Sequence, residues 1–141
     1  MMYTHILFDL DGTLTDPKIG ITKSVQYALS KFGIIVNDLD SLVTFIGPPL
    51  QVSFREQFSF SDHDSKQAIA YYREYFSERG IFENEIFAGI QELLEQLASQ
   101  KKTLMVATSK PTLYAEKIVN YFNMDRYFLK VHGSELDGTR S

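Results

Sequence analysis

The sequence predicts an α/β fold, in which a core of parallel strands and helices is interrupted by a long helical insert. Three observations support this prediction. An apolar run at residues 6–8 ends directly on acidic residues, residues 18–82 show helical spacing without a clear strand, and strand and helix patterns alternate again from residue 83. We therefore expect two parts, a core of residues 1–17 and 83–141 and a helical insert of residues 18–82.

Each element follows from apolar spacing and from the residues at its ends. In the insert, Gly33 and Gly80 are expected to end helices and Ser61 to begin one. The helices expected in the insert span residues 19–32, 40–46, 50–58 and 61–79. In the core, a first strand before Asp9 is expected to be followed by a helix at 90–100, a strand at 103–107, a helix at 112–122 and a strand at 128–132.

The segment at residues 6–16, ILFDLDGTLTD, brings two carboxylates to the end of a buried strand. Side chains of an extended strand alternate between faces, so Asp9 and Asp11 are expected on the same side. Two like charges held close together favour a bound divalent cation or a shared proton. Gly12 permits a sharp turn, in which the backbone N–H groups of Gly12 and Thr13 can face an anion. A carboxylate nucleophile, a metal and an anion cradle indicate phosphoryl transfer.

A second candidate for the site follows the strand expected at residues 103–107, where the sequence reads Thr108-Ser109-Lys110-Pro111. Pro111 suits the first turn of a helix, so Thr108 or Ser109 would present a hydroxyl and backbone N–H groups at a helix N-terminus, which favours an anion. The alternative is an ordinary helix cap. Lys110 is expected either to reach a phosphate or to be a solvated loop lysine.

The run Phe8-Asp9-Leu10-Asp11-Gly12-Thr13 resembles the Asp-x-Asp-Gly-Thr signature of the haloacid dehalogenase superfamily, and within it the phosphoglycolate-phosphatase-like group. The resemblance implies a Rossmann-like parallel sheet with an inserted helical cap subdomain. It also implies that Asp9 is the nucleophile that forms an aspartyl-phosphate, that Asp11 is the general acid and base, and that both hold Mg²⁺, Asp11 through its backbone carbonyl. Thr108 would be the hydroxyl of the second motif. The alternative for the first motif is an acidic turn after a strand.

The insert matches the superfamily's cap in position and in helical character. Gly47 and Pro48 lie in a loop that resembles the one these phosphatases turn toward the substrate, and the alternative is a plain turn. Arg55 and Lys23 are candidates to pair with a second anionic group of the substrate, or else are ordinary surface charges. Aromatic residues of the insert are expected in its core, and a stripe of them would permit a homodimer.

The resemblance stops before the superfamily's third and fourth motifs. Neither the lysine of the third motif nor the acidic pair of the fourth has a candidate before Ser141. The sequence therefore predicts a fragment of a longer product or a naturally short chain. Weak magnesium binding, an exposed sheet edge and reduced or absent activity are expected to follow.

Composition argues against several other classes of function. The formal net charge of −4 and the absence of a basic stripe argue against nucleic acid as a partner. The sequence contains no cysteine, which excludes disulfides and thiolate metal sites. No apolar run approaches the roughly 18 residues of a membrane span, and with no leader pattern a cytoplasmic location is expected.

Other readings of function stay open at this point. A P-loop enzyme would need a Gly-x4-Gly-Lys-Ser/Thr motif, which the sequence lacks, and a response-regulator receiver would lack the helical insert. We expect a magnesium-dependent phosphatase of small phosphate monoesters. The alternatives are an inert binding or assembly module of the same fold, and a nucleotidase or phosphomutase of the same superfamily.

Overall fold

The computed structural model describes residues 5–135. Within this range the contacts divide the chain into two compact units. The core unit comprises residues 5–16 and 85–135, and the helical unit comprises residues 17–84.

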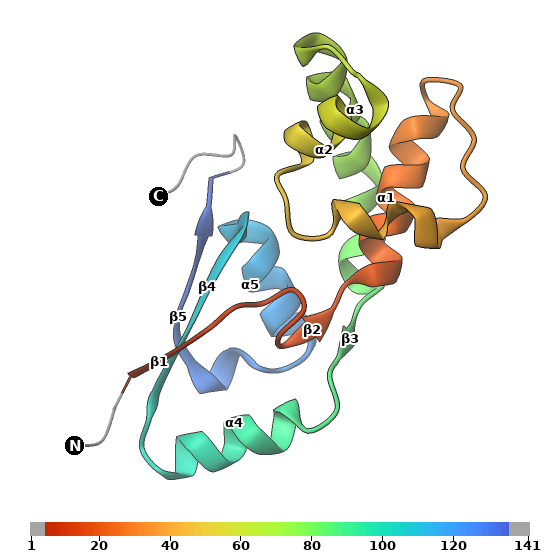
Figure 1. The fold of residues 1–141 in the computed structure, drawn as a ribbon. Coiled ribbons are helices and arrows are strands. Elements are labelled where there is room, and N and C mark those ends of the chain that lie inside the picture. The colour runs from red at the N-terminus through yellow and green to blue at the C-terminus, as the bar shows by residue number, and fades with distance from the viewer. Residues whose placement is uncertain (1–4, 136–141) are drawn as a thin grey trace. The chain divides into compact units, whose positions relative to one another are not determined.

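The core unit holds a parallel sheet of three strands in the order β1-β4-β5 (Figure 1). β1 (His5–Phe8) pairs with β4 (Thr103–Pro111) in a register that sets Phe8 opposite Val106. β4 pairs on its other side with β5 (Phe128–Ser134). Leu104 and Val106 of the central strand β4 are buried and form part of the core. The α/β fold with a parallel sheet that the sequence predicts is confirmed.

Two helices of the core unit match the predicted ranges to within a residue at either end. They are α4 (Ile90–Ser99) and α5 (Thr112–Tyr121). Figure 1 shows α5 beside β4 and β5, and it packs against both strands. The side chains that α5 buries are apolar and recur at helical spacing, which is why the sequence revealed this helix. A short 3-10 turn, η3 (Asp125–Tyr127), leads into β5.

A second, two-stranded sheet was not predicted from the sequence. β2 (Thr15–Asp16) pairs antiparallel with β3 (Glu85–Ile86), so that Thr15 lies opposite Ile86. Each strand is two residues long, which is too short to produce a recognisable alternation of apolar and polar side chains. This ladder joins the two segments of the core unit next to their ends at residues 16 and 85.

The helical unit contains no strand between its described residues, as the sequence indicates. Helix α1 (Lys18–Ser30) packs on α3 (Asp62–Phe76), and α2 (Leu50–Phe58) also packs on α3. Phe54, Tyr72 and Phe76 are buried, so the prediction that aromatic residues form the core of this part is confirmed for these three. Phe45 is buried as well, although it was not among the residues predicted for this core. Two 3-10 helices, η1 (Leu39–Phe45) and η2 (Gly80–Phe82), complete the unit.

Two helix predictions in this unit were wrong in detail. The segment expected at 40–46 is a 3-10 helix, η1, whose first turn is closed by the Asp38 side chain accepting from Asp40 N at 3.0 Å. Helix α3 ends at Phe76, three residues before the expected end. Gly80 does not terminate α3 but lies in η2, where it is buried because it packs against Gly20 of α1.

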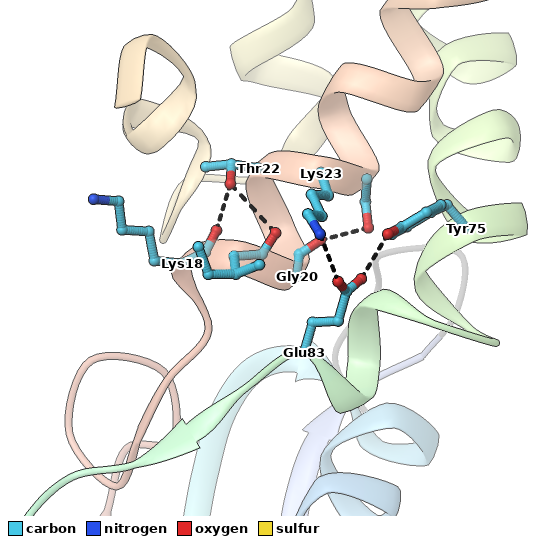
Figure 2. Close-up of polar contacts among 8 residues, drawn as sticks. Lys18, Gly20, Thr22, Lys23, Tyr75 and Glu83 are labelled. Carbon is cyan, nitrogen blue, oxygen red and sulfur yellow. Dashed lines mark hydrogen bonds and ion pairs between the residues drawn. The ribbon is translucent and has the colours of Figure 1, made fainter. Parts of the chain in front are cut away.

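Glu83 connects the first and third helices of the helical unit through its two carboxylate oxygens (Figure 2). Lys23 donates to Oε2 at 3.0 Å, and the hydroxyl of Tyr75 donates to Oε1 at 2.7 Å. Burial raises the pKa of Tyr75, and the hydrogen bond and charge of Glu83 raise it further, to about 12. Burial alone would raise the pKa of Glu83, but the donors Tyr75 and Lys23 outweigh it and lower that pKa.

None of the helices among residues 5–135 combines the length and the apolar character that crossing a bilayer requires.

Candidate active site

Strands β1 and β4 end at the same edge of the parallel sheet, and a candidate site residue follows at each end. Because Phe8 lies opposite Val106, the next residues along the two strands are Asp9 and Ala107, and Thr108 comes one residue later. Ligands of parallel α/β sheets bind at the carboxyl ends of the strands. The register therefore brings the two predicted motifs to one place.

Backbone hydrogen bonds within the loop after β1 hold that loop in a tight turn. Leu10 and Leu14 are fully buried and anchor it, and Leu14 N donates to Leu10 O at 2.9 Å. Gly12 has φ +82°, a conformation that glycine adopts without strain, and Gly12 N donates to Thr15 O at 2.8 Å. The sharp turn expected at Gly12 is thus confirmed.

This geometry changes two expectations about the loop. The backbone N–H groups of Gly12 and Thr13 were expected to face an anion, but they donate to the carbonyls of Thr15 and Leu10. Both N–H groups are therefore used inside the loop, and the Thr13 residue is exposed. In addition, β1 ends at Phe8, so the alternation of an extended strand does not reach as far as Asp11.

The two acidic residues have different environments. Asp9 is exposed, and its Oδ1 accepts a hydrogen bond from Leu10 N at 2.8 Å. The side chain of Asp11 is only 18% exposed. Two carboxylates in unlike environments are suited to different tasks, as nucleophile and as proton carrier.

Strand β5 holds the segment that follows Ala107. The Ser134 hydroxyl donates to Ser109 O at 3.0 Å, and Gly133 N donates to Thr112 Oγ1 at 2.9 Å. A Cβ at position 133 would collide with the carbonyl oxygen of Lys110 and would lie 2.8 Å from Thr112 N, so only glycine allows this approach. The sequence did not predict that Gly133 and Ser134 contact the segment from Ser109 to Thr112. The local signal was limited to a Gly-Ser pair after an apolar strand.

The prediction that Thr108 or Ser109 lies at a helix N-terminus was wrong. β4 does not stop at Ala107 but continues irregularly to Pro111, and α5 begins at Thr112 without a side-chain cap. The Thr108 side chain, in a residue 5% exposed, instead accepts from Lys110 N at 3.1 Å. Pairing with β5 extends the strand, which the local sequence did not reveal.

Lys110 and Asp11 form an ion pair in the core unit. Lys110 Nζ lies 3.2 Å from Asp11 Oδ2, and the Lys110 side chain is 8% exposed. This excludes the expectation of a solvated loop lysine. Asp11 Oδ1 is buried and has no hydrogen-bond partner among the residues that the structure describes. One oxygen of this carboxylate is thus held by a cation, and the other is left for a further group.

The donors present suit a magnesium ion held in part by solvent. Among residues 5–135 no three His, Cys, Asp or Glu side chains lie close enough together to hold a metal ion. Mg²⁺ is usually bound through one or two carboxylates, with waters and substrate phosphate filling the remaining positions. The exposed Asp9 carboxylate and the backbone carbonyl of Asp11 are oxygen donors of the kind that magnesium accepts, whereas the Asp11 side chain is engaged by Lys110 through Oδ2.

The candidate substrate residues of the insert lie within the helical unit. Gly47 has φ +111° and is exposed together with Pro48. Arg55 pairs with Asp62 at 3.6 Å, and both side chains are more than half exposed, so this pair adds little stability. Lys23 is engaged by Glu83. A substrate role for Gly47, Pro48 and Arg55 stays a prediction.

A family model described as haloacid dehalogenase-like hydrolase matches residues 6–138. The match includes both segments of the core unit and the whole helical unit. The chain belongs to the haloacid dehalogenase-like hydrolase family. The resemblance noted in the first motif is therefore confirmed over almost the full sequence.

Three relatives in this family illustrate the likeness. A 5′-nucleotidase of Pseudomonas aeruginosa is 51% identical over all of this chain and 64% of its own length. The crystal structure of a predicted phosphatase from Clostridium acetobutylicum is 50% identical with a TM-score of 0.93, covering 98% of this chain and 64% of that one. A phosphoglycolate phosphatase of Mannheimia succiniciproducens is 27% identical over 91% of this chain and 61% of its own length. The chain thus spans less than two thirds of these haloacid dehalogenase-like relatives.

Proposed function

We propose that this haloacid dehalogenase-like chain is the nucleophile-bearing part of a phosphatase that hydrolyses small phosphate monoesters. The observation that supports the proposal best is the convergence of Asp9, Asp11 and Thr108 on one edge of the parallel sheet. There Asp11 is fixed by Lys110 at 3.2 Å, although the two residues lie on separate segments of the core unit. The helical unit would act as the cap.

In the proposed reaction, a carboxylate oxygen of Asp9 attacks the phosphorus of the monoester. The bond from phosphorus to the leaving oxygen breaks, and Asp11 gives that oxygen a proton. Water then attacks the phosphorus of the aspartyl-phosphate and gives a proton to Asp11, which frees Asp9 and inorganic phosphate. The exposure of Asp9 suits the attack, and the shielding of Asp11 suits proton transfer.

The phosphate group would be bound by hydroxyl and backbone groups from both segments. Thr108 accepts from Lys110 N, so its own O–H is available to donate to a phosphate oxygen. The exposed Thr13 hydroxyl and the Ser109 backbone are further candidates. Asp9 and the backbone carbonyl of Asp11 would hold Mg²⁺, which when bound neutralises charge on the transferring phosphoryl group.

The names of the relatives suggest a substrate class by analogy. The relative named a 5′-nucleotidase is 51% identical and the one named a phosphoglycolate phosphatase is 27% identical. We therefore propose nucleoside 5′-monophosphates before phosphoglycolate as substrates.

The test is turnover of a panel of monoesters by the 141-residue chain in Mg²⁺. The panel contains adenosine 5′-monophosphate, phosphoglycolate and p-nitrophenyl phosphate. We expect slow but measurable phosphate release, because the lysine of the third motif and the acidic pair of the fourth have no candidate in the sequence. This release should be abolished by Asp9→Asn and unchanged by Asp125→Asn, an identical chemical change at an exposed residue of η3. Equal release by the wild type and Asp9→Asn would reject the proposal in favour of an inert module.

A further inference from the structure

The Lys110 ammonium is placed against a carboxylate rather than toward solvent. Its side chain is 8% exposed, and Nζ lies 3.2 Å from Asp11 Oδ2. A lysine so well shielded from water needs a counter-charge, and Asp11 supplies one. The pair joins the loop after β1 to the irregular end of β4.

The backbone on both sides of this pair is fixed by other contacts. On the Asp11 side, Gly12 N donates to Thr15 O at 2.8 Å and buried Leu10 anchors the turn. On the Lys110 side, its N–H donates to Thr108 Oγ1 at 3.1 Å. With both backbones held, the freedom that remains to Asp11 is rotation of its side chain, and the ion pair restricts that rotation.

From this geometry we infer that Lys110 is a positioning residue for Asp11. Its ammonium holds Oδ2, so that the buried and unpartnered Oδ1 is the oxygen presented to the reacting groups. The inference rests on the proposed function, because Asp11 needs a fixed orientation only if it transfers protons. It differs from the expectation that Lys110 serves as a phosphate ligand.

The two roles make different predictions about the leaving group. p-Nitrophenolate leaves without protonation, whereas the 5′-oxygen of adenosine monophosphate needs a proton as its bond to phosphorus breaks. Loss of a positioned acid therefore harms the alkyl ester selectively. Loss of a phosphate ligand harms both esters alike, because both carry the same phosphoryl group.

The experiment compares kcat/KM for these two esters in the 141-residue chain with Mg²⁺. For Lys110→Met we expect a loss of about tenfold or more with adenosine 5′-monophosphate and a loss of no more than about threefold with p-nitrophenyl phosphate. Lys110→Arg keeps the charge and should recover part of the loss. In the Asp11→Asn background, Lys110→Met should have almost no further effect on the alkyl ester.

Three outcomes separate the possibilities. Equal losses for both esters would overturn the positioning role and leave Lys110 as a phosphate ligand. Losses that multiply in the Lys110→Met, Asp11→Asn double variant would overturn it as well. If the wild type turns over neither ester, the proposed function fails and the inference fails with it, whereas turnover with equal losses rejects only the inference. Far-UV circular dichroism and urea unfolding of each variant show that a loss is not caused by unfolding.

Discussion

Gly20 of α1 and Gly80 of η2 lie so close together that neither position has room for a Cβ atom. A Cβ on Gly20 would collide with the carbonyl of Gly80 and lie 2.9 Å from Glu83 O, and Gly20 N donates to that same Glu83 oxygen at 2.9 Å. The contact joins the beginning and the end of the helical unit, next to the Glu83 network (Figure 2).

Substituting alanine at this contact should destabilise the helical unit. An ordinary Gly→Ala change inside a helix stabilises by about 1 kcal/mol, but in Gly20→Ala the overlap with Gly80 forces the backbones apart, for a net loss of about 1–3 kcal/mol. Urea unfolding followed by circular dichroism measures this loss. Gly33→Ala measures backbone strain without overlap, because its Cβ position is open but its φ of +76° disfavours alanine. If Gly20→Ala is as stable as the wild type, the contact is not as close as described.

Tyr75→Phe should change how stability depends on alkaline pH. The pKa of Tyr75 is raised to about 12 from an ordinary value of 10.0, so the folded state retains the proton that the unfolded state loses. Its contribution is therefore complete below pH 10 and decreases as the pH rises through about 12. Tyr75→Phe should lower the free energy of unfolding by about 1 kcal/mol near neutral pH. That free energy should then decrease less steeply at alkaline pH than it does in the wild type.

The measurement is the urea unfolding free energy of wild type and Tyr75→Phe at several pH values from 8 to 12. Tyr71→Phe is the matched control, since the Tyr71 ring packs on Phe32 with ring centroids 6.0 Å apart. Parallel curves for the wild type and Tyr75→Phe would show that the Tyr75–Glu83 hydrogen bond adds no pH dependence.

Glu83 should also make stability depend on acidic pH, because its pKa in the folded state is lowered from the ordinary value of 4.5. Its contribution to the free energy of unfolding is present above pH 4.5 and is lost as the pH falls through the lowered pKa.

Gly133→Ala should loosen the segment from Ser109 to Thr112. The new methyl group meets the Lys110 carbonyl and the Thr112 N–H, so the hydrogen bond from Gly133 N to Thr112 Oγ1 cannot keep its 2.9 Å length. Hydrogen exchange measured by mass spectrometry should show faster exchange in peptides that cover this segment. Gly89→Ala, in the same unit, has open space around position 89 and strains only its own backbone at φ +85°, so it should leave the exchange of the segment from Ser109 to Thr112 unchanged. Unchanged exchange in Gly133→Ala would contradict the role given to this glycine.

Leu7→Lys should reduce self-association of the chain. β1 is a terminal strand in the sheet order of the described residues, and Leu7 is 63% exposed on it. Exposed apolar edge strands pair with other chains, and a lysine opposes this. Light scattering at increasing concentration tests the expectation. Ile35→Lys adds the same charge at a residue that is 72% exposed in the helical unit, and an equal effect there would exclude an edge-specific cause.

The sequence predicted the elements with strong periodicity and missed those fixed by distant contacts. Helices α4 and α5 were found because their apolar residues recur at helical spacing. The continuation of β4 to Pro111 was missed because it depends on pairing with Ser134, and the two-residue strands carry no pattern of their own.

The same distinction holds for the candidate site. The acidic pair and Thr108 were identified from their motifs, which are local. The ion pair of Lys110 with Asp11, and the use of the Gly12 and Thr13 N–H groups inside their own loop, depend on three-dimensional contacts that no local pattern encodes.

The proposed function depends on a covalent intermediate at Asp9, and trapping it is the most direct test. The 141-residue chain is mixed with Mg²⁺ and adenosine 5′-monophosphate, quenched in acid and treated with borohydride, which reduces an aspartyl-phosphate to homoserine. Peptide mass spectrometry should then find homoserine in place of aspartate at position 9, and not in the Asp9→Asn variant. Phosphate release without any modification of Asp9, or homoserine at another aspartate, would contradict the account.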